Sequence, residues 1–118
     1  MNYTNIFMVR GDTLWFKFTV EGLTTDLDSA YFSCRQDVEK TPVNYVFQKS
    51  IGDGITKVDT TDNSVTYEVI VAPEDTENVD IGNYYYDLQL TKDGEVMTPF
   101  IGVLNINYDV TRPSNQSV

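Results

Sequence analysis

Apolar and polar residues alternate over most of this sequence, and this period of two limits how the chain can fold more than any other feature. In residues 13–20 every second residue is apolar, and only Trp15 interrupts the polar row between them. Residues 65–71 and 83–91 show the same alternation. Because successive side chains of a strand point to opposite faces, each segment predicts a strand with one buried face.

Turn residues divide the rest of the chain into short pieces. The predicted strands cover residues 3–9, 13–20, 30–37, 44–50, 55–58, 65–71, 83–91 and 96–110. Gly52-Asp53-Gly54 and Lys92-Asp93-Gly94-Glu95 predict tight turns, and Pro73 to Glu77 predicts a single helical turn. Seven to nine strands with almost no helix predict an all-β antiparallel sandwich in one domain at residues 1–111. A flexible polar tail is expected at residues 112–118.

The charge of the chain argues against two classes of partner. Eight basic and eighteen acidic residues give a formal net charge of −10. The negative electrostatic field of such a chain repels the phosphates of nucleic acids and of anionic membranes, so neither is an expected partner. No apolar run approaches the ~18 residues of a membrane helix, and the N-terminus lacks a signal-peptide pattern. The chain is therefore expected to be made as a soluble cytoplasmic product.

The residue inventory also argues against catalysis. The sequence has no histidine, which excludes Ser-His-Asp and Cys-His sites and any imidazole ligand for a metal. The single cysteine, Cys34, lies in phase with Ala30 and Phe32, so we expect a buried core residue that forms no intrachain disulfide. The chain is therefore expected not to be an enzyme and to need no cofactor.

The acidic turns contain oxygen ligands of the kind that calcium binds, but their spacing does not predict a calcium site. The candidate oxygen ligands are Asp53, Asp59, Asp62 and Asn63. Calcium takes six or more oxygen ligands, but the spacing of these residues fits no established loop pattern. We predict solvated turns and no bound metal.

The segment Asp80-Ile-Gly82-Asn-Tyr84-Tyr-Tyr86 is the most specific motif in the chain. Asp-x-Gly-x-Tyr is typical of the start of strand F in immunoglobulin-like domains, where the tyrosine hydroxyl bonds to upstream backbone in a "tyrosine corner". Asp80, Gly82 and Tyr84 are therefore assigned structural roles. Tyr86 stands where an antibody domain has its second cysteine, so the motif predicts an immunoglobulin-like sandwich without a disulfide.

Several further motifs follow one another in a characteristic order. They are Arg10-Gly11-Asp12-Thr13, Thr25-Asp26-Leu27-Asp28-Ser29-Ala30, Ala72-Pro73-Glu74-Asp75-Thr76, Gly82-Asn83-Tyr84-Tyr85-Tyr86-Asp87, Asp93-Gly94, Gly102 and Asp109-Val110-Thr111. Together they resemble the N-terminal domain of the phage baseplate upper protein family and related immunoglobulin-like virion domains of tailed bacteriophages. The resemblance spans residues 8–111, and the order of the motifs is more specific than any one of them.

The resemblance implies a non-catalytic structural protein of the virion, made in the cytoplasm of the bacterial host. Its expected partners are other virion proteins, namely capsid, neck or baseplate subunits, and self-association as a homo-oligomer is left open. Members of the family often carry a fibre or receptor-binding region after this domain, whereas this sequence stops within a few residues. An accessory or adaptor domain, such as a capsid decoration, is therefore expected rather than a fibre.

Apolar residues that are out of phase with the predicted buried face of their strand are the candidates for a docking surface. They are Trp15, Tyr85, Met97, Ile101 and Val103. Aromatic anchors are favoured at protein interfaces, although loop cover or a shifted register would also explain these residues. Pairing of the first or last strand with a neighbouring sheet is a second route to docking. The alternative function is a carbohydrate- or receptor-binding module, with Trp15, Tyr85 or Tyr45 as the stacking platform.

Overall fold

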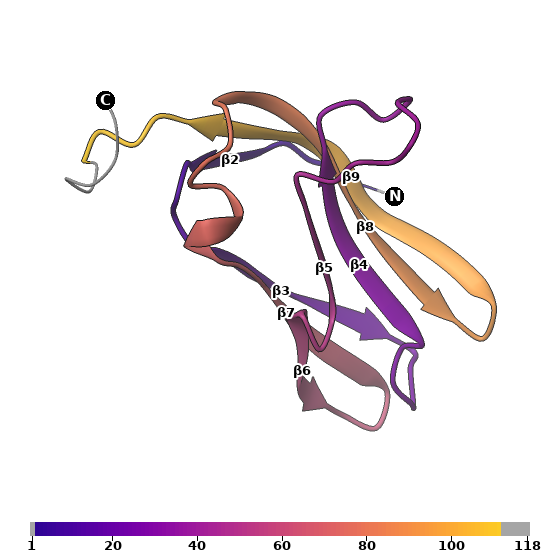
Figure 1. Cartoon of the computed structure of the whole chain (residues 1–118). Helices are drawn as coiled ribbons and strands as arrows, with labels where there is room; N and C mark the ends of the chain where they lie inside the picture. Colours follow the sequence, from indigo (N-terminus) through magenta and orange to yellow (C-terminus); the bar gives the residue numbers. More distant parts are fainter. Residues whose placement is uncertain (1, 112–118) are drawn as a thin grey trace.

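The described part of the chain folds into nine strands and one short 3-10 helix, which confirms the predicted all-β class (Figure 1). The computed structural model describes residues 2–111. The elements are β1 (Asn2–Tyr3), β2 (Ile6–Val9), β3 (Leu14–Glu21), β4 (Ser29–Arg35), β5 (Phe47–Ile51), β6 (Gly54–Thr60), β7 (Ser64–Val71), η1 (Pro73–Asp75), β8 (Gly82–Lys92) and β9 (Glu95–Asn107). The predicted tail at 112–118 lies outside the described residues.

The strands form two facing layers. Their hydrogen-bonded order is β1-β9-β8-β4-β5-β6-β7-β3, and β2 also pairs with β9. This ladder folds over at the turn between β5 and β6, because Phe16 of β3 and Phe32 of β4 meet with ring centroids 5.1 Å apart. We call β1, β2, β9, β8, β4 and β5 the first sheet, and β6, β7 and β3 the second sheet. With β4 beside β8 and β3 beside β7, this is an immunoglobulin-like sandwich.

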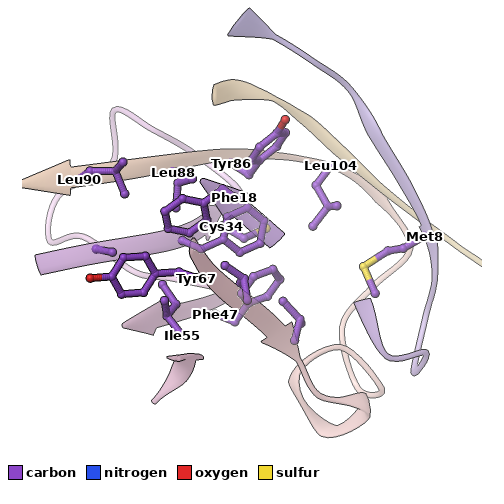
Figure 2. Packing of buried hydrophobic residues seen from close by; sticks show 14 of the residues in the cluster. Met8, Phe18, Cys34, Phe47, Ile55, Tyr67, Tyr86, Leu88, Leu90 and Leu104 are labelled. Atoms are coloured by element: carbon purple, nitrogen blue, oxygen red, sulfur yellow. The ribbon is translucent and has the colours of Figure 1, made fainter. Parts of the chain in front are cut away.

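Aromatic packing replaces the missing disulfide at the centre of the sandwich. The fully buried ring of Phe32 contacts Phe16, Phe47 and Tyr86, with centroid separations of 5.1, 5.9 and 5.6 Å. Cys34 is buried nearby on β4, directly opposite Tyr86 on β8 (Figure 2). Large aromatic rings bury much apolar area, so the layers hold together through packing.

The end of β9 differs from the sequence prediction. The alternation predicted a strand to residue 110 with Tyr108 and Val110 facing inward, but β9 ends at Asn107 and these side chains are 67% and 99% exposed. The prediction was wrong because the neighbouring strands stop first. β8 begins at Gly82 opposite Ile106, and β2 ends opposite Asn107. Without partner strands, apolar residues gain no buried face.

The tyrosine of the Asp-x-Gly-x-Tyr motif makes a local backbone contact. The Tyr84 ring is buried and its hydroxyl donates a hydrogen bond to the carbonyl oxygen of Asp80. Gly82 lies between them with φ of +148°, a backbone conformation that residues other than glycine rarely adopt. This is the geometry of a tyrosine corner at the start of β8.

Removing the Tyr84 hydroxyl should weaken the fold slightly but measurably. We expect Tyr84→Phe to lower the free energy of unfolding by about 1 kcal/mol, because the Asp80 carbonyl loses its donor. Tyr85→Phe is the matched control, since Tyr85 is exposed and on the opposite face of the same strand. Urea unfolding of both variants makes the measurement, and an equal effect at the two positions would contradict this role for Tyr84.

The link between β1 and β2 turns a carbonyl group into the core. The Thr4 carbonyl oxygen accepts a hydrogen bond of 2.6 Å from the Tyr86 hydroxyl, while the Thr4 amide donates to Ile101. Gly102 makes this approach possible, because a Cβ there would lie 1.9 Å from the Thr4 oxygen. The N-terminal strands are thus fastened to β9 at a point where only glycine fits.

Substitution of Gly102 should release the N-terminal strands. We expect Gly102→Ala to cost about 3 kcal/mol, because the added methyl group forces the Thr4 carbonyl away and breaks its bond with Tyr86. Hydrogen exchange should rise throughout residues 2–9. Tyr86→Phe, which removes only the hydroxyl, should cost about 1 kcal/mol. Equal stabilities for the native chain and Gly102→Ala would show that this contact is unimportant.

A candidate docking groove on the first sheet

The outer face of the first sheet carries a groove lined by tyrosines. Its volume is about 840 Å³. The lining residues used below are Tyr3, Tyr31, Tyr45, Tyr85, Ser33, Arg35, Gln48, Asp87, Gln89 and Ile101. We call this set the tyrosine groove. Its four tyrosine side chains are between 40% and 70% exposed, although large aromatic side chains usually contribute to a core.

Strand pairing brings these residues together from distant parts of the sequence. One row across the sheet joins Ser33 of β4 to Asp87 of β8, then to Ile101 of β9 and Tyr3 of β1. A parallel row joins Arg35 to Tyr85 and Val103. Since directly opposite residues on paired strands share a face, each row places its side chains on the same side of the sheet.

The floor of the groove contains polar groups with unused hydrogen-bonding capacity. Arg35 donates from Nη2 to the carbonyl oxygen of Lys40, but its buried Nε–H has no partner among the described residues. Burial raises the pKa of the Asp87 carboxyl, and the charge of Arg35 lowers it by a smaller amount. A buried donor without a partner costs free energy, so these groups are suited to an incoming ligand.

Gln48 extends the polar strip to β5. Its side-chain amide donates a 3.0 Å hydrogen bond to the Ser33 hydroxyl. Ser33 and Gln48 are opposite each other on β4 and β5, which holds the amide group at the groove. The groove therefore combines aromatic surface with fixed amide, carboxylate and guanidinium groups.

Three of the predicted docking residues lie on this face and two do not. Tyr85, Ile101 and Val103 share the outer face of the first sheet. Trp15 lies on the second sheet, where it is opposite Ile70, and the two side chains are 60% and 41% exposed. The five residues therefore do not form one surface.

Met97 also differs from its predicted orientation. The alternation placed it outward with Ile101 and Val103, but Met97 is paired with the buried Leu90. The register of β8 and β9 shifts between Leu88 and Leu90, and such a bulge reverses the phase of the residues beyond it. Met97 is nevertheless 37% exposed. Sequence alternation does not reveal a bulge, so the alternation could not predict the face on which Met97 lies.

Sequence reasoning missed much of the groove. Tyr3, Tyr31, Arg35 and Asp87 were not among the predicted docking residues. Tyr31, Ser33 and Arg35 alternate with buried Ala30, Phe32 and Cys34, so a face was readable from the sequence of β4. Its junction with Tyr3 was not, because that depends on the parallel pairing of β1 with β9.

The one thiol of the chain is buried, away from the surface of the groove. Burial raises the pKa of the Cys34 thiol to about 12, which keeps the thiol protonated at neutral pH. Within residues 2–111, no three side chains among cysteine, aspartate and glutamate converge as metal ligands would.

The helix η1 is far too short to cross a membrane, and the described residues contain no helix that could do so.

Comparison with known proteins identifies no family for this chain. No protein-family model and no curated protein matches the chain. Among solved structures, one similar chain is from the extracellular domains of the voltage-gated sodium channel β4 subunit, described as parallel homodimers that explain a role in cell–cell adhesion. It is 13% identical, covers 92% of this chain and 93% of its own, and has a TM-score of 0.42.

The Ig1 domain of mouse SynCAM 2 is a second similar structure. It is 19% identical, covers 89% of this chain and 92% of its own, and has a TM-score of 0.35. Both TM-scores are below 0.5, so the assignment to an immunoglobulin-like sandwich rests on the strand order described above. The likenesses carry no argument about function.

The partly buried carboxylate of Asp87 should reduce stability at neutral pH. Its folded-state pKa is raised from an ordinary value of 3.8, so ionisation favours the unfolded chain once the pH rises above that value. We expect Asp87→Asn to be more stable relative to the native chain at pH 7 than at pH 3. Thermal unfolding at both pH values measures this difference. Asp93→Asn, at an exposed hairpin turn, is the control, and a pH-independent gain would contradict the role of charge.

Proposed function

We propose that this chain is a non-catalytic structural domain of a tailed-phage virion that docks on a multimeric scaffold through its tyrosine groove. The observation that carries the proposal is a concave sheet face in which four exposed tyrosines surround Arg35 and Asp87. Tyrosine and arginine are enriched at the energetic centres of protein interfaces. The motif order that resembles baseplate upper proteins supports placing the scaffold in a phage particle.

The chemistry of the chain supports a role without catalysis. Catalysis by nucleophilic attack or proton transfer needs an activated group near neutral pKa. The sequence has no histidine, and the Cys34 thiol is buried with its pKa raised to about 12. A groove with fixed polar groups and aromatic walls is suited to recognition.

The overall charge favours a basic partner surface. A chain of net charge −10 is attracted to a positively charged scaffold over distances of about a Debye length, roughly 8 Å at physiological salt. Within the groove, Asp87 would meet a donor of the scaffold and the free Arg35 Nε–H would meet an acceptor. Association should therefore become slower as salt concentration rises.

The proposal is tested on particles of the phage that encodes the chain. Particles made without the chain are incubated with purified protein, and the bound copies are counted by quantitative mass spectrometry. We expect saturable binding by the native chain and at least tenfold weaker binding by Tyr85→Ala, since central aromatic anchors contribute about 2 kcal/mol. Trp15→Ala, on the opposite sheet, is the matched control and should bind as the native chain does.

Two outcomes would contradict the proposal. Native particles that lack the chain would exclude a virion component. Particles that bind Tyr85→Ala as well as native protein would leave the virion role but exclude the groove as its docking surface.

A carbohydrate-binding module is the second candidate, and the same groove favours it. Tyrosine rings can stack on sugars, while Asp87, Gln48 and Gln89 offer acceptors and donors for hydroxyl groups. Glycan-array screening of the native chain, with Asp87→Ala as the binding-site variant, separates the two candidates. Strong hits that Asp87→Ala abolishes would favour the module over the adaptor.

A further inference from the structure

β3 has a free edge along its whole length. On one side all its residues, from Leu14 to Glu21, pair with β7 in an unbroken antiparallel register. On its other side, no strand within residues 2–111 pairs with it, because β1 and β2 pair with β9. An unpaired edge offers a row of backbone donors and acceptors to another strand.

The register identifies which backbone groups are free. The amide of Gly22 donates a 2.7 Å hydrogen bond to the carbonyl of Asn63, in the same register as the β3–β7 pair. Bonded and non-bonded pairs alternate in an antiparallel ladder, so the even-numbered residues of β3 bond to β7. The N–H and C=O groups of four residues therefore point away from β7. They are Trp15, Lys17, Thr19 and Glu21.

Two other edges within the described residues carry features that discourage strand addition, and the edge formed by β1 and β2 is divided between two short strands. β1 and β2 pair with β9 only from Phe100 onward, and the unpaired edge before it contains Pro99 and lies at a register shift. β6 has a register shift between Lys57 and Asp59. Bulges and prolines are common means of protecting edges. β3 has neither a bulge nor a proline. Its one basic side chain, Lys17, is the main feature that discourages pairing with another strand.

Two hollows lie beside this edge, between the sheets. One of about 130 Å³ includes Phe16 and Phe100 in its lining, and one of about 430 Å³ includes Val20 and Met97. The inward side chains of Phe16 and Val20 are only partly buried as a result. A further strand beside β3 would cover both hollows.

We propose that β3 pairs antiparallel with β3 of a second copy of this chain, around a two-fold axis at Phe18. Residue i then lies opposite residue 36 − i of the other copy, which places Lys17 opposite Thr19 and Phe16 opposite Val20. Trp15 lies opposite Glu21 at each end. The second sheets of the two copies become one continuous sheet, and this interface is separate from the tyrosine groove.

Backbone complementarity favours this register. It pairs all four residues of β3 whose backbone groups are free, Trp15 with Glu21 and Lys17 with Thr19, whereas an axis at Thr19 would leave Trp15 without a partner in β3. Each Lys17 is diagonal to both Glu21 and Lys17 of the other copy, so attraction and repulsion roughly balance, and no like charges are directly opposite. Shifting the axis to residue 17 would place the two lysines directly opposite each other, which is destabilising. Because the same strand serves both copies, the contact closes at two and forms no polymer.

Net charge sets the conditions in which the pair forms. Two chains of net charge −10 repel each other, and added salt screens that repulsion. Backbone hydrogen bonds and apolar burial are far less sensitive to salt. We expect dimerisation to strengthen as salt is raised from about 0.05 to about 0.5 M, the opposite of the salt dependence expected for the groove.

Sedimentation equilibrium of the full chain tests the proposal. We expect a monomer–dimer equilibrium, and Lys17→Pro should weaken it at least tenfold, because proline removes a free-edge N–H but no bond to β7. Lys17→Thr removes the same charge but keeps the backbone donor, so it is the matched control and should weaken the dimer less than Lys17→Pro does. Circular dichroism checks that each variant remains folded.

A second pair of variants tests the register without altering the backbone. Thr19→Lys places the introduced lysine opposite Lys17 of the other copy and should also weaken the dimer at least tenfold. Thr66→Lys adds the same charge on the central strand β7, on the same face and away from the edge, and should weaken it less.

Cross-linking then locates the axis. A mixture of Lys17→Cys and Thr19→Cys chains should form disulfide dimers much faster than either chain alone, since their Cα atoms would be about 5.5 Å apart. The native Cys34 is buried and should not contribute.

The proposal fails if the chain is monomeric at all salt and protein concentrations tested. It fails equally if Lys17→Pro and Thr19→Lys, both folded, dimerise as the native chain does. These results would leave docking through the groove untouched, since Tyr85→Ala, which lies outside β3, reports on that function separately.

Discussion

The packing of Phe32 against rings from both sheets is the contact on which the rest of this structure depends. Phe16 of the second sheet meets it at 5.1 Å, while Phe47 and Tyr86 surround it from the first. Immunoglobulin domains of antibodies fasten the same layers with a disulfide. Here the fastening is apolar, and it also fixes Tyr86, whose hydroxyl holds the carbonyl of Thr4 and with it the N-terminal strands.

Fastening β1 to β9 has a consequence on each side of the sandwich. It adds Tyr3 to the outer face of the first sheet, where it completes the tyrosine groove. It also leaves β3 without a partner, because the N-terminal strands cannot pair with both sheets at once. The groove and the free edge therefore have a common origin, and they are suited to different partners: a charged, aromatic surface in one case and an extended strand in the other.

Local patterns predicted the elements well wherever a strand is flanked on both sides. Buried Cys34 and the strands around residues 65–71 and 83–91 follow directly from alternation and turn chemistry. Prediction failed where neighbours decide the outcome. A register shift places Met97 on the same face as the buried Leu90, and Tyr108 is exposed because the adjacent strands have already ended. Neither event leaves a sign in the periodicity of one strand.

The sequence by itself determined the class of fold, since a period of two with frequent turns and a single cysteine permits a β-sandwich without a disulfide. It also determined which side chains of a strand share a face wherever no register shift interrupts the strand, as in β4 and β7. Only the tertiary structure decided which faces meet. Tyr85, Arg35, Asp87 and Tyr3 form one groove because pairing between distant strands sets their register, whereas Trp15 lies on the opposite sheet. Long-range register is a property of the assembled sandwich, and no local pattern contains it.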